Sequence, residues 1–244
     1  MTRLLRSIAI VLIALGVISG IARSLYPTTL GSNVASYRDD AFGMHGASAA
    51  ERRIEVAAVE ARFAAYPSWI VLHASVGSIL LVAGALQFVP FLRTRHLRFH
   101  KWNGRVLIAL SIIVALTAVF FGVIIPAEGV GEAVIIGAAS LWFLIAMTQG
   151  ALAIRRKDKR NHGQWMIRAS AIALGVPAIR IVAAVGDLLL TPRGWGLKGI
   201  FLLSLVVGWA IAIVVAELWL LRAHHDRLGN AIVHRPAIRM DEVL

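Results

Sequence analysis

The sequence predicts an all-α membrane protein, a polytopic bundle of six transmembrane helices. Hydrophobic residues make up 59% of its 244 residues, charged residues make up 16%, and the mean hydropathy is +0.77. A soluble domain is about 45–50% apolar and about 25% charged. The apolar residues also form long runs, and roughly 20 helical residues are enough to cross a ~30 Å hydrocarbon core. Both observations place the chain in a lipid bilayer.

Six apolar runs account for the predicted spans. Five contain no charged residue and occupy residues 7–22, 63–92, 106–127, 133–154 and 199–216. The remaining run, residues 165–190, spans the bilayer if Arg168 extends to the interface and Arg180 stays within the membrane. The first run also has the basic start of a signal peptide, but its length and its place in the alternation of loops favour a retained span.

Basic residues are gathered in alternate loops. They precede the first run, separate the second from the third and the fourth from the fifth, and follow the last: Arg3, Arg6, Arg93, Arg95, Arg98, Lys101, Arg105, Arg155, Arg156, Lys157, Lys159, Arg160, Arg222 and Arg227. The positive-inside rule makes these loops cytoplasmic. We therefore expect both termini in the cytoplasm, a multi-pass protein of the bacterial inner membrane, and attraction of these loops to anionic lipid head groups.

One long loop and one tail lie outside the predicted spans. Within the loop at residues 27–68, the segment 49–65 is rich in Ala, Glu and Arg without Gly or Pro, which predicts a helix on the outer surface. Pro67 then suits the first turn of the second span. The chain is thus a single transmembrane domain over residues 1–222, followed by a basic cytoplasmic tail over residues 223–244.

Charge and cysteine content exclude several classes of function. The net charge of +12 lies in the loops and the tail, where it orients the protein and predicts no nucleic-acid partner. The absence of cysteine excludes disulfides, cysteine-ligated clusters and thiolate chemistry. His96 and His100 have the spacing of a zinc pair, but Leu97 replaces the glutamate of a zinc protease and arginines flank the site. We therefore predict no metal site, and no motif assigns the chain to a class of enzyme.

Polar and small residues form one stripe on each of three predicted helices. At 100° per residue, the stripes fall within about 40° of a common direction. They comprise His73, Gly77, Leu80, Gly84, Gln87 and Phe91; His100, Gly104, Leu107, Ser111, Ala118 and Gly122; and His162, Met166, Ala169, Ala173, Arg180, Ala184 and Asp187. Small residues allow close approach of membrane helices, so these stripes should face the bundle interior. Pro177 should kink the third of these helices.

Depth along the spans divides the polar residues of these stripes into two layers. His100 and His162 both begin spans at the basic side, and Gln87 ends a span there, so these three form an inner layer. His73, Arg180 and Asp187 lie toward the opposite side and form an outer layer. An arginine within the membrane is costly, which makes Arg180 a candidate functional residue.

Several short motifs occur in a fixed order between the second and fifth spans. They are Gly84-Ala85-Leu86-Gln87-Phe88, Leu92-Arg93-Thr94-Arg95, His100 with Gly104-Arg105, and His162 with Trp165-Met166 and Arg168. Over residues of about 65–190 this pattern resembles the domain of unknown function 2306 family of predicted bacterial membrane proteins. Lys101 and Gly163 depart from the family pattern, in which arginine commonly follows the histidine. The resemblance implies an architecture and no established activity.

Two specific functions remain open at this point, beside a non-catalytic membrane scaffold and an enzyme that acts on lipid. In the first, the protein binds or transports a small, anionic molecule or a quinone through an intramembrane pocket of His73, Arg180, Gln87 and Asp187. In the alternative, His100 and His162 are axial ligands of a b-type haem in a membrane electron-transfer protein, as in four-helix cytochromes of the b561 and ferric-reductase type. The fourth span contains no histidine, so a second bis-histidine haem is not expected.

Overall fold

Six long apolar helices dominate the structure, a computed structural model that describes residues 3–41 and 47–233. They are α1 (Arg3–Leu25), α4 (Pro67–Gln87), α6 (Leu97–Val119), α7 (Val130–Arg155), α8 (Lys159–Leu190) and α9 (Leu197–Val233). Each is long and apolar enough to cross a membrane. No strand occurs among the described residues. The prediction of an all-α protein with six spans is therefore confirmed.

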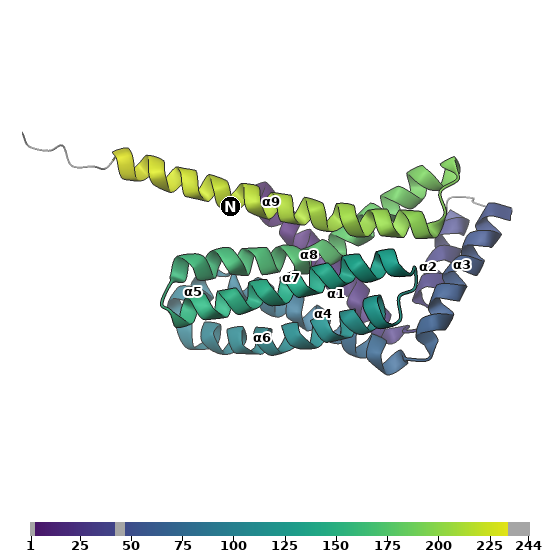
Figure 1. Ribbon diagram of the computed structural model, residues 1–244, viewed down its shortest axis with the longest axis horizontal. Coiled ribbons are helices and arrows are strands. Elements are labelled where there is room, and N and C mark those ends of the chain that lie inside the picture. The colour runs from purple at the N-terminus through teal and green to yellow at the C-terminus, as the bar shows by residue number, and fades with distance from the viewer. Residues whose placement is uncertain (1–2, 42–46, 234–244) are drawn as a thin grey trace, which may run out of the picture.

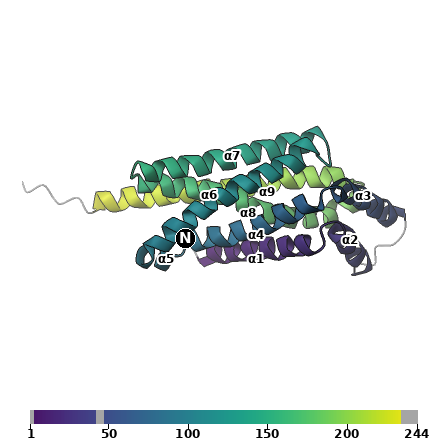
Figure 2. The ribbon, with the colours of Figure 1, turned by 90° about the horizontal axis from the view of Figure 1, so that it is seen from below.

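The six helices lie lengthwise beside one another (Figures 1 and 2). Helices α4, α6, α7 and α8 pack in that order around the hydrophobic core, α1 packs against α4 and α8, and α9 packs along α8. Short loops join consecutive spans from α6 to α9, which makes these neighbours antiparallel.

The two ends of the bundle differ. At one end, α2 (Leu30–Ala41) and α3 (Ala47–Ala64) form a helical hairpin, and we call this the hairpin end. At the other, α5 (Pro90–Arg95) and the loop between α7 and α8 carry basic residues, and we call this the basic end. The helix predicted at residues 49–65 is confirmed as α3, whereas α2 was not predicted from the sequence.

The apolar run at residues 63–92 does not form one helix. The span α4 begins with Pro67 in its first turn, as predicted, and ends at Gln87. A turn follows, and Pro90 begins α5. Proline disfavours helical geometry in the residue before it, which accounts for the extended conformation of Val89 and for the change of direction. Two other short segments, the π-helix Phe120–Ile124 after α6 and a 3₁₀ turn at Thr191–Arg193 after α8, extend the ends of spans.

Helices α8 and α9 pack closely against each other. Gly175 leaves room for the indole of Trp209, whose Nε1 donates to the carbonyl of Ile172 at 3.1 Å. In return, Gly208 lies against the backbone of Ile179, where an added Cβ would be 2.8 Å from the amide nitrogen. Pro177 lies within this contact, and the second half of α8 turns away in Figure 1, in agreement with the predicted kink.

Small residues also allow α1 to pack closely against α4. A Cβ at Gly20 would overlap the Ser78 hydroxyl, and the hydroxyls of Ser24 and Ser75 are 2.9 Å apart. Gly16 likewise lies against Leu81. Glycines four residues apart on one face are typical of closely packed membrane helices.

The last helix extends beyond the predicted end of the membrane domain at residue 222. It continues to Val233, so that the first part of the predicted tail is helical, and it projects past the basic end of the bundle in both views (Figures 1 and 2). The rest of the predicted tail, residues 234–244, lies outside the described residues.

Candidate functional site

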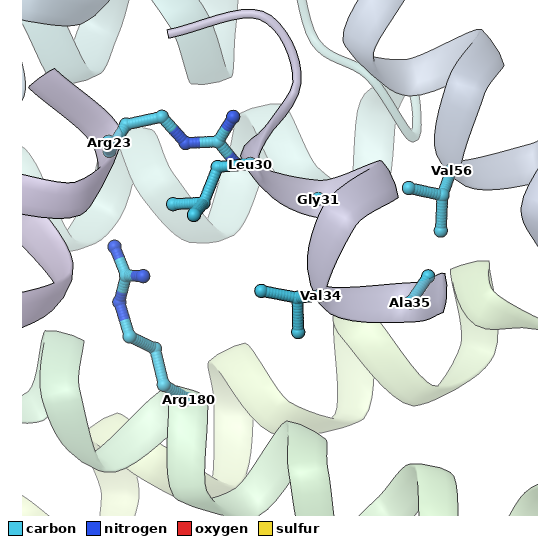
Figure 3. Close-up of a pocket in the computed structure, with 7 residues that line it drawn as sticks. All are labelled: Arg23, Leu30, Gly31, Val34, Ala35, Val56 and Arg180. Atoms are coloured by element: carbon cyan, nitrogen blue, oxygen red, sulfur yellow. The ribbon is translucent and has the colours of Figure 1, made fainter. Parts of the chain in front are cut away.

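A hollow of about 280 Å³ lies at the hairpin end, between α1, α2, α3 and α8. We call it the Arg180 hollow, and its lining residues are Arg23, Leu30, Gly31, Val34, Ala35, Val56 and Arg180. Figure 3 shows Arg23 and Arg180 extending into the same space from α1 and α8, with the apolar side chains of α2 beside them. The hollow therefore combines two guanidinium groups with an apolar wall.

The Arg180 guanidinium has no hydrogen bond and no ion pair with any described side chain or backbone group. Its side chain is exposed to the hollow although it lies ten residues before the end of α8. At 1.5 Å per residue this is roughly 15 Å from the end of the helix. An arginine within a span costs about 2.5–3.5 kcal/mol on insertion scales and usually has a partner. The hollow thus presents one uncompensated positive charge.

Arg23 differs from Arg180 because a carboxylate accompanies it. Glu60 of α3 is buried and lies 3.4 Å from the guanidinium of Arg23. The same carboxylate accepts hydrogen bonds from the amides of Gly31 and Ser32, at 2.5 and 3.1 Å, and from the Ser32 hydroxyl. These amides belong to the first turn of α2, where a negative charge is favourable. Glu60 therefore holds the hairpin together and neutralises Arg23.

His73 lies near the hollow without lining it. It is within electrostatic range of Arg180, and its Nδ1 is 2.7 Å from the Thr117 hydroxyl of α6. That hydroxyl has a single hydrogen, which it donates to the carbonyls of Ile113 and Val114 at 2.8 and 3.0 Å, so it accepts from His73. The proton of His73 is thereby placed on Nδ1, and Nε2 is the nitrogen that can gain or lose a proton.

Asp187 is joined to α3 and not to Arg180. Its carboxylate is 3.3 Å from the Arg52 guanidinium and accepts a hydrogen bond from the Thr191 hydroxyl at 2.7 Å. Both members of the Arg52–Asp187 pair are nearly buried, with side chains 7% and 11% exposed. This pair fastens the hairpin to the end of α8, so Asp187 has a structural partner.

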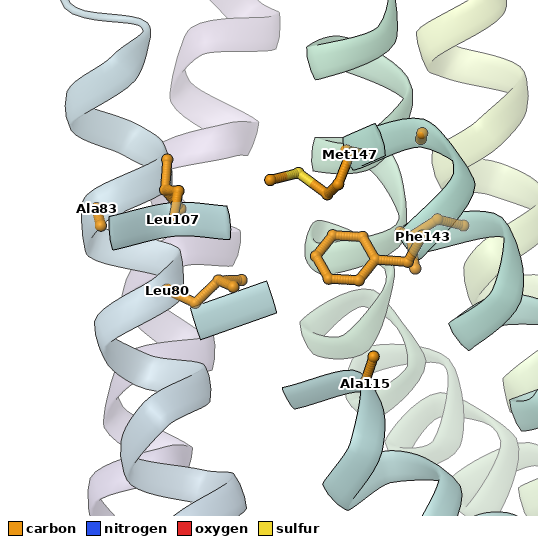
Figure 4. Close-up of a cluster of buried hydrophobic side chains, with 9 residues drawn as sticks. Leu80, Ala83, Leu107, Ala115, Phe143 and Met147 are labelled. Atoms are coloured by element: carbon orange, nitrogen blue, oxygen red, sulfur yellow. The ribbon is translucent and has the colours of Figure 1, made fainter. Parts of the chain in front are cut away.

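An apolar core separates the hairpin end from the basic end. Phe143 and Met147 of α7 reach toward Leu80 of α4 and Leu107 of α6 (Figure 4). The other buried members of the cluster are Ala83, Ala115, Ala146, Ala169 and Ile172. Residues of all three predicted stripes take part, which confirms that the middle of each stripe faces the interior.

Two side-chain amides hold α4 and α6 together at the basic end. Gln87 of α4 donates from Nε2 to the backbone carbonyl of His100, at 3.0 Å. Asn103 of α6, which is buried, donates from Nδ2 to the carbonyl of Ala83, at 2.8 Å. We call this exchange the amide clasp, and it gives Gln87 a structural role far from the Arg180 hollow.

The two inner histidines lie within electrostatic range of each other. His162 Nδ1 is 2.8 Å from the carbonyl of Gly150 on α7, and a carbonyl can only accept, so the proton is on Nδ1 and the lone pair is on Nε2. His100 Nδ1 is buried and makes no hydrogen bond among the described residues. This pair thus offers imidazole nitrogens that the fold itself does not satisfy.

Arg168, which was expected to extend to the interface, has a carboxylate partner on the neighbouring span. Its guanidinium makes two hydrogen bonds to the carboxylate of Glu217 on α9, at 2.6 and 3.0 Å, and its Cζ lies 5.0 Å from the ring of Trp165. A forked pair of this kind fixes both position and orientation. Trp165 in turn contacts Trp142 of α7, with ring centroids 6.2 Å apart. Arg168 therefore joins α8 to α9.

A comparison with protein families assigns this architecture. The profile of a family described as a predicted membrane protein (DUF2306) matches residues 70–220, more than half of the chain. The protein belongs to the DUF2306 family. The match confirms the resemblance in the sequence motifs and carries no activity with it. No curated protein and no solved structure matches the chain.

The DUF2306 region and the Arg180 hollow overlap only in part. The amide clasp, the two inner histidines and the Arg168–Glu217 pair all lie within residues 70–220, as does Arg180. Arg23, the lining residues of α2 and Val56 lie before it. The matched region thus includes the basic end and Arg180, whereas the hollow is completed by the first span and the hairpin.

Of the four residues expected to form one pocket, the structure brings only His73 and Arg180 into range of each other. Arg23 was missed because a basic residue in the last turn of a span is usually an interfacial anchor. The one available signal was its position at the same end of the bundle as Arg180. Among the described residues, no group of three or more His, Asp or Glu side chains is arranged to hold a metal ion.

Proposed function

We propose that the protein binds a small anionic molecule in the Arg180 hollow, as a carrier or receptor in the membrane. The observation that supports this proposal is the exposed Arg180 guanidinium, which has no anionic partner among the described residues and faces a hollow lined by a second arginine. A positive charge held at membrane depth is stabilised by an anion that enters the hollow. Lining side chains of α2 would contact an apolar part of the same molecule.

The position of His73 suggests how binding is coupled to protons. An anion beside Arg180 would cancel the positive charge nearest to His73. His73 is also buried, so protonation on Nε2 further requires that the bound anion or accompanying water stabilise the new charge. Proton uptake together with anion binding is the behaviour expected of a symporter or of a pH-sensitive receptor. Gln87 and Asp187 take no part in this proposal, because the amide clasp and Arg52 account for them.

The test is binding of hexanoate to detergent-purified protein, measured by isothermal titration calorimetry. Arg180→Gln should remove binding while leaving the melting temperature of the unliganded protein unchanged or higher, since it removes a charge without a partner. Arg98→Gln is the matched control, because it removes the same charge from an exposed position at the basic end. Wild-type protein that binds neither hexanoate nor other small anions would rule out the proposal.

A second candidate function is haem binding by His100 and His162. It is favoured by the proton on His162 Nδ1, which leaves Nε2 available as metal ligands require, and by the unsatisfied Nδ1 of His100. Gly84 and Gly163 have open space where a Cβ would lie, as approach of a flat group demands. A haem held there would supply one-electron transfer, while Gly150 would orient His162.

The haem proposal has a direct spectroscopic test. Protein expressed with ample haem should show an absorption band that His100→Ala and His162→Ala each remove, whereas His96→Ala, an exposed neighbour, should retain it. A colourless wild-type protein would exclude the proposal. The anion site does not depend on this result, because the two sites lie at opposite ends of the bundle.

We further propose that the basic end faces the cytoplasm of a bacterial inner membrane, with both termini inside. The clustering of Lys and Arg at this end supports the orientation. Because the chain contains no cysteine, single cysteines introduced at Thr94 and Arg193 can be labelled without background. A membrane-impermeant maleimide should label the second position and not the first in intact cells, and the reverse pattern would invert the assignment.

A further inference from the structure

Glu60 is the one described carboxylate that contacts an arginine of the Arg180 hollow. The two carboxylate oxygens of Glu60 accept hydrogen bonds from Arg23 and from three donors at the start of α2. The carboxylate is buried, so its charge is screened much less than that of an exposed group. The walls of the hollow therefore carry two positive charges and, directly behind one of them, one negative charge.

From this arrangement we propose that Glu60 makes the site selective for singly charged anions with an apolar body. The net charge around the hollow is +1, supplied by Arg180, because Glu60 cancels Arg23. One carboxylate of a ligand can pair with Arg180. A second carboxylate on the same ligand would approach Arg23 and meet the repulsion of Glu60, and the alternative position for it is against Leu30, Val34 and Val56, where a charge is costly.

This inference rests on the proposed anion site and adds its substrate class. The lining favours a monocarboxylate with a short apolar chain or ring over a dicarboxylate or a phosphate dianion. Glu60 acts through Arg23 and through the charge of the hollow, so it is a specificity-determining residue and does not itself contact the ligand.

Hexanoate and adipate are suitable probes, because they have the same number of carbons and differ by one terminal carboxylate. We expect wild-type protein to prefer hexanoate. Glu60→Gln leaves a net charge of +2 and should raise the affinity for adipate relative to hexanoate by about tenfold, as expected for one unit charge at close range. Glu51→Gln, an exposed position on the same helix, is the matched control and should leave the ratio unchanged.

Arg23→Gln gives an independent measurement of the same charge balance. It leaves Arg180 and Glu60 to cancel each other, so hexanoate affinity should fall by about tenfold. The double variant Arg23→Gln/Glu60→Gln restores a net charge of +1, and its hexanoate affinity should return to within about threefold of wild type. Arg23→Gln decides the matter even if the Glu60→Gln proteins do not fold, since it keeps the Glu60 carboxylate on its three donors of α2.

The results distinguish failure of the selectivity inference from failure of the anion site itself. If hexanoate binding depends on Arg180 but the adipate ratio is unchanged in Glu60→Gln, or Arg23→Gln has wild-type affinity, then Glu60 does not set selectivity and the anion site stands. If the wild type binds neither probe, or Arg180→Gln binds as well as wild type, the anion site itself is wrong and this inference falls with it.

Discussion

Replacing Gly208 with alanine tests the close backbone contact between α8 and α9. An added Cβ would lie 2.5 Å from Ile179 Cγ1 and 2.8 Å from both Cα and the amide nitrogen of the same residue. A Cβ contact shorter than 3.4 Å is already tight, so the backbones of α8 and α9 must separate by at least roughly 0.6 Å at this point. No side-chain rotation relieves the overlap, because two of the three atoms belong to the backbone.

The size of the effect follows from two opposing contributions. Overpacking of this kind costs about 1–3 kcal/mol, and the better helix propensity of alanine returns up to about 1 kcal/mol. A gap of 0.5–1 Å also weakens the dispersion contacts on either side by about a quarter to a half, including those of Trp209 in the space left by Gly175. We therefore expect the Gly208→Ala protein to be destabilised by about 1–2 kcal/mol.

The assay is unfolding in mixed detergent micelles by sodium dodecyl sulfate, followed by far-ultraviolet circular dichroism. Gly77→Ala is the matched control, because it makes the same change within a span at a site with no atom within 4 Å of the new Cβ. It should be neutral or stabilising. Equal stability of the Gly208→Ala and wild-type proteins, or equal losses in both variants, would refute the packing described for α8 and α9.

Two further predictions concern the basic end. Asn103→Leu should destabilise the protein by about 0.6 kcal/mol, the average for a hydrogen bond between membrane helices. Asn103→Asp should destabilise it more, because a carboxylate oxygen would face the Ala83 carbonyl. The same unfolding assay measures both variants, and an Asn103→Asp protein of wild-type stability would contradict the amide clasp. Asp158 caps α8 by accepting hydrogen bonds from the backbone and side chain of Asn161, which lower the pKa of Asp158 from its usual 3.8. Because the pKa is lower in the folded state, the cap stabilises the protein above pH 3.8 and is lost as the pH falls through the folded value. Asp158→Ala should therefore lower the melting temperature at pH 7 and make no difference well below pH 3.8, and a difference independent of pH would exclude the charged cap.

The spans and their polar layers could be predicted because the bilayer imposes them. Backbone groups in lipid must be satisfied within a helix, so uncharged runs of sufficient length leave few alternatives. Helical periodicity then places Leu80, Leu107 and Ala169 on interior faces, and each is buried. Depth follows from counting residues, which is why His100 and His162 do lie together at one end and His73 near Arg180 at the other.

Periodicity gives the face and depth of a residue but not its partner. Arg52 and Asp187 are 135 residues apart, and nothing in their local sequence connects them. Similarly, α2 is short and is not apolar overall, and its first turn is stabilised by Glu60 from the next helix. Such contacts depend on how the hairpin folds back over the spans. The Arg180 hollow could not be predicted for the same reason, since its walls come from four helices.

The length of α9 has a mechanical consequence. Its 37 residues extend about 55 Å at 1.5 Å per residue, whereas the hydrocarbon core is about 30 Å thick. The part that projects past the basic end continues, without a break, the part of α9 that packs against α8 through Gly208 and Trp209. A small tilt of α8 at its Pro177 kink would therefore displace the far end of α9 by a larger distance. A fluorophore at the far end of α9 would thus report small movements beside Arg180 as larger displacements in water.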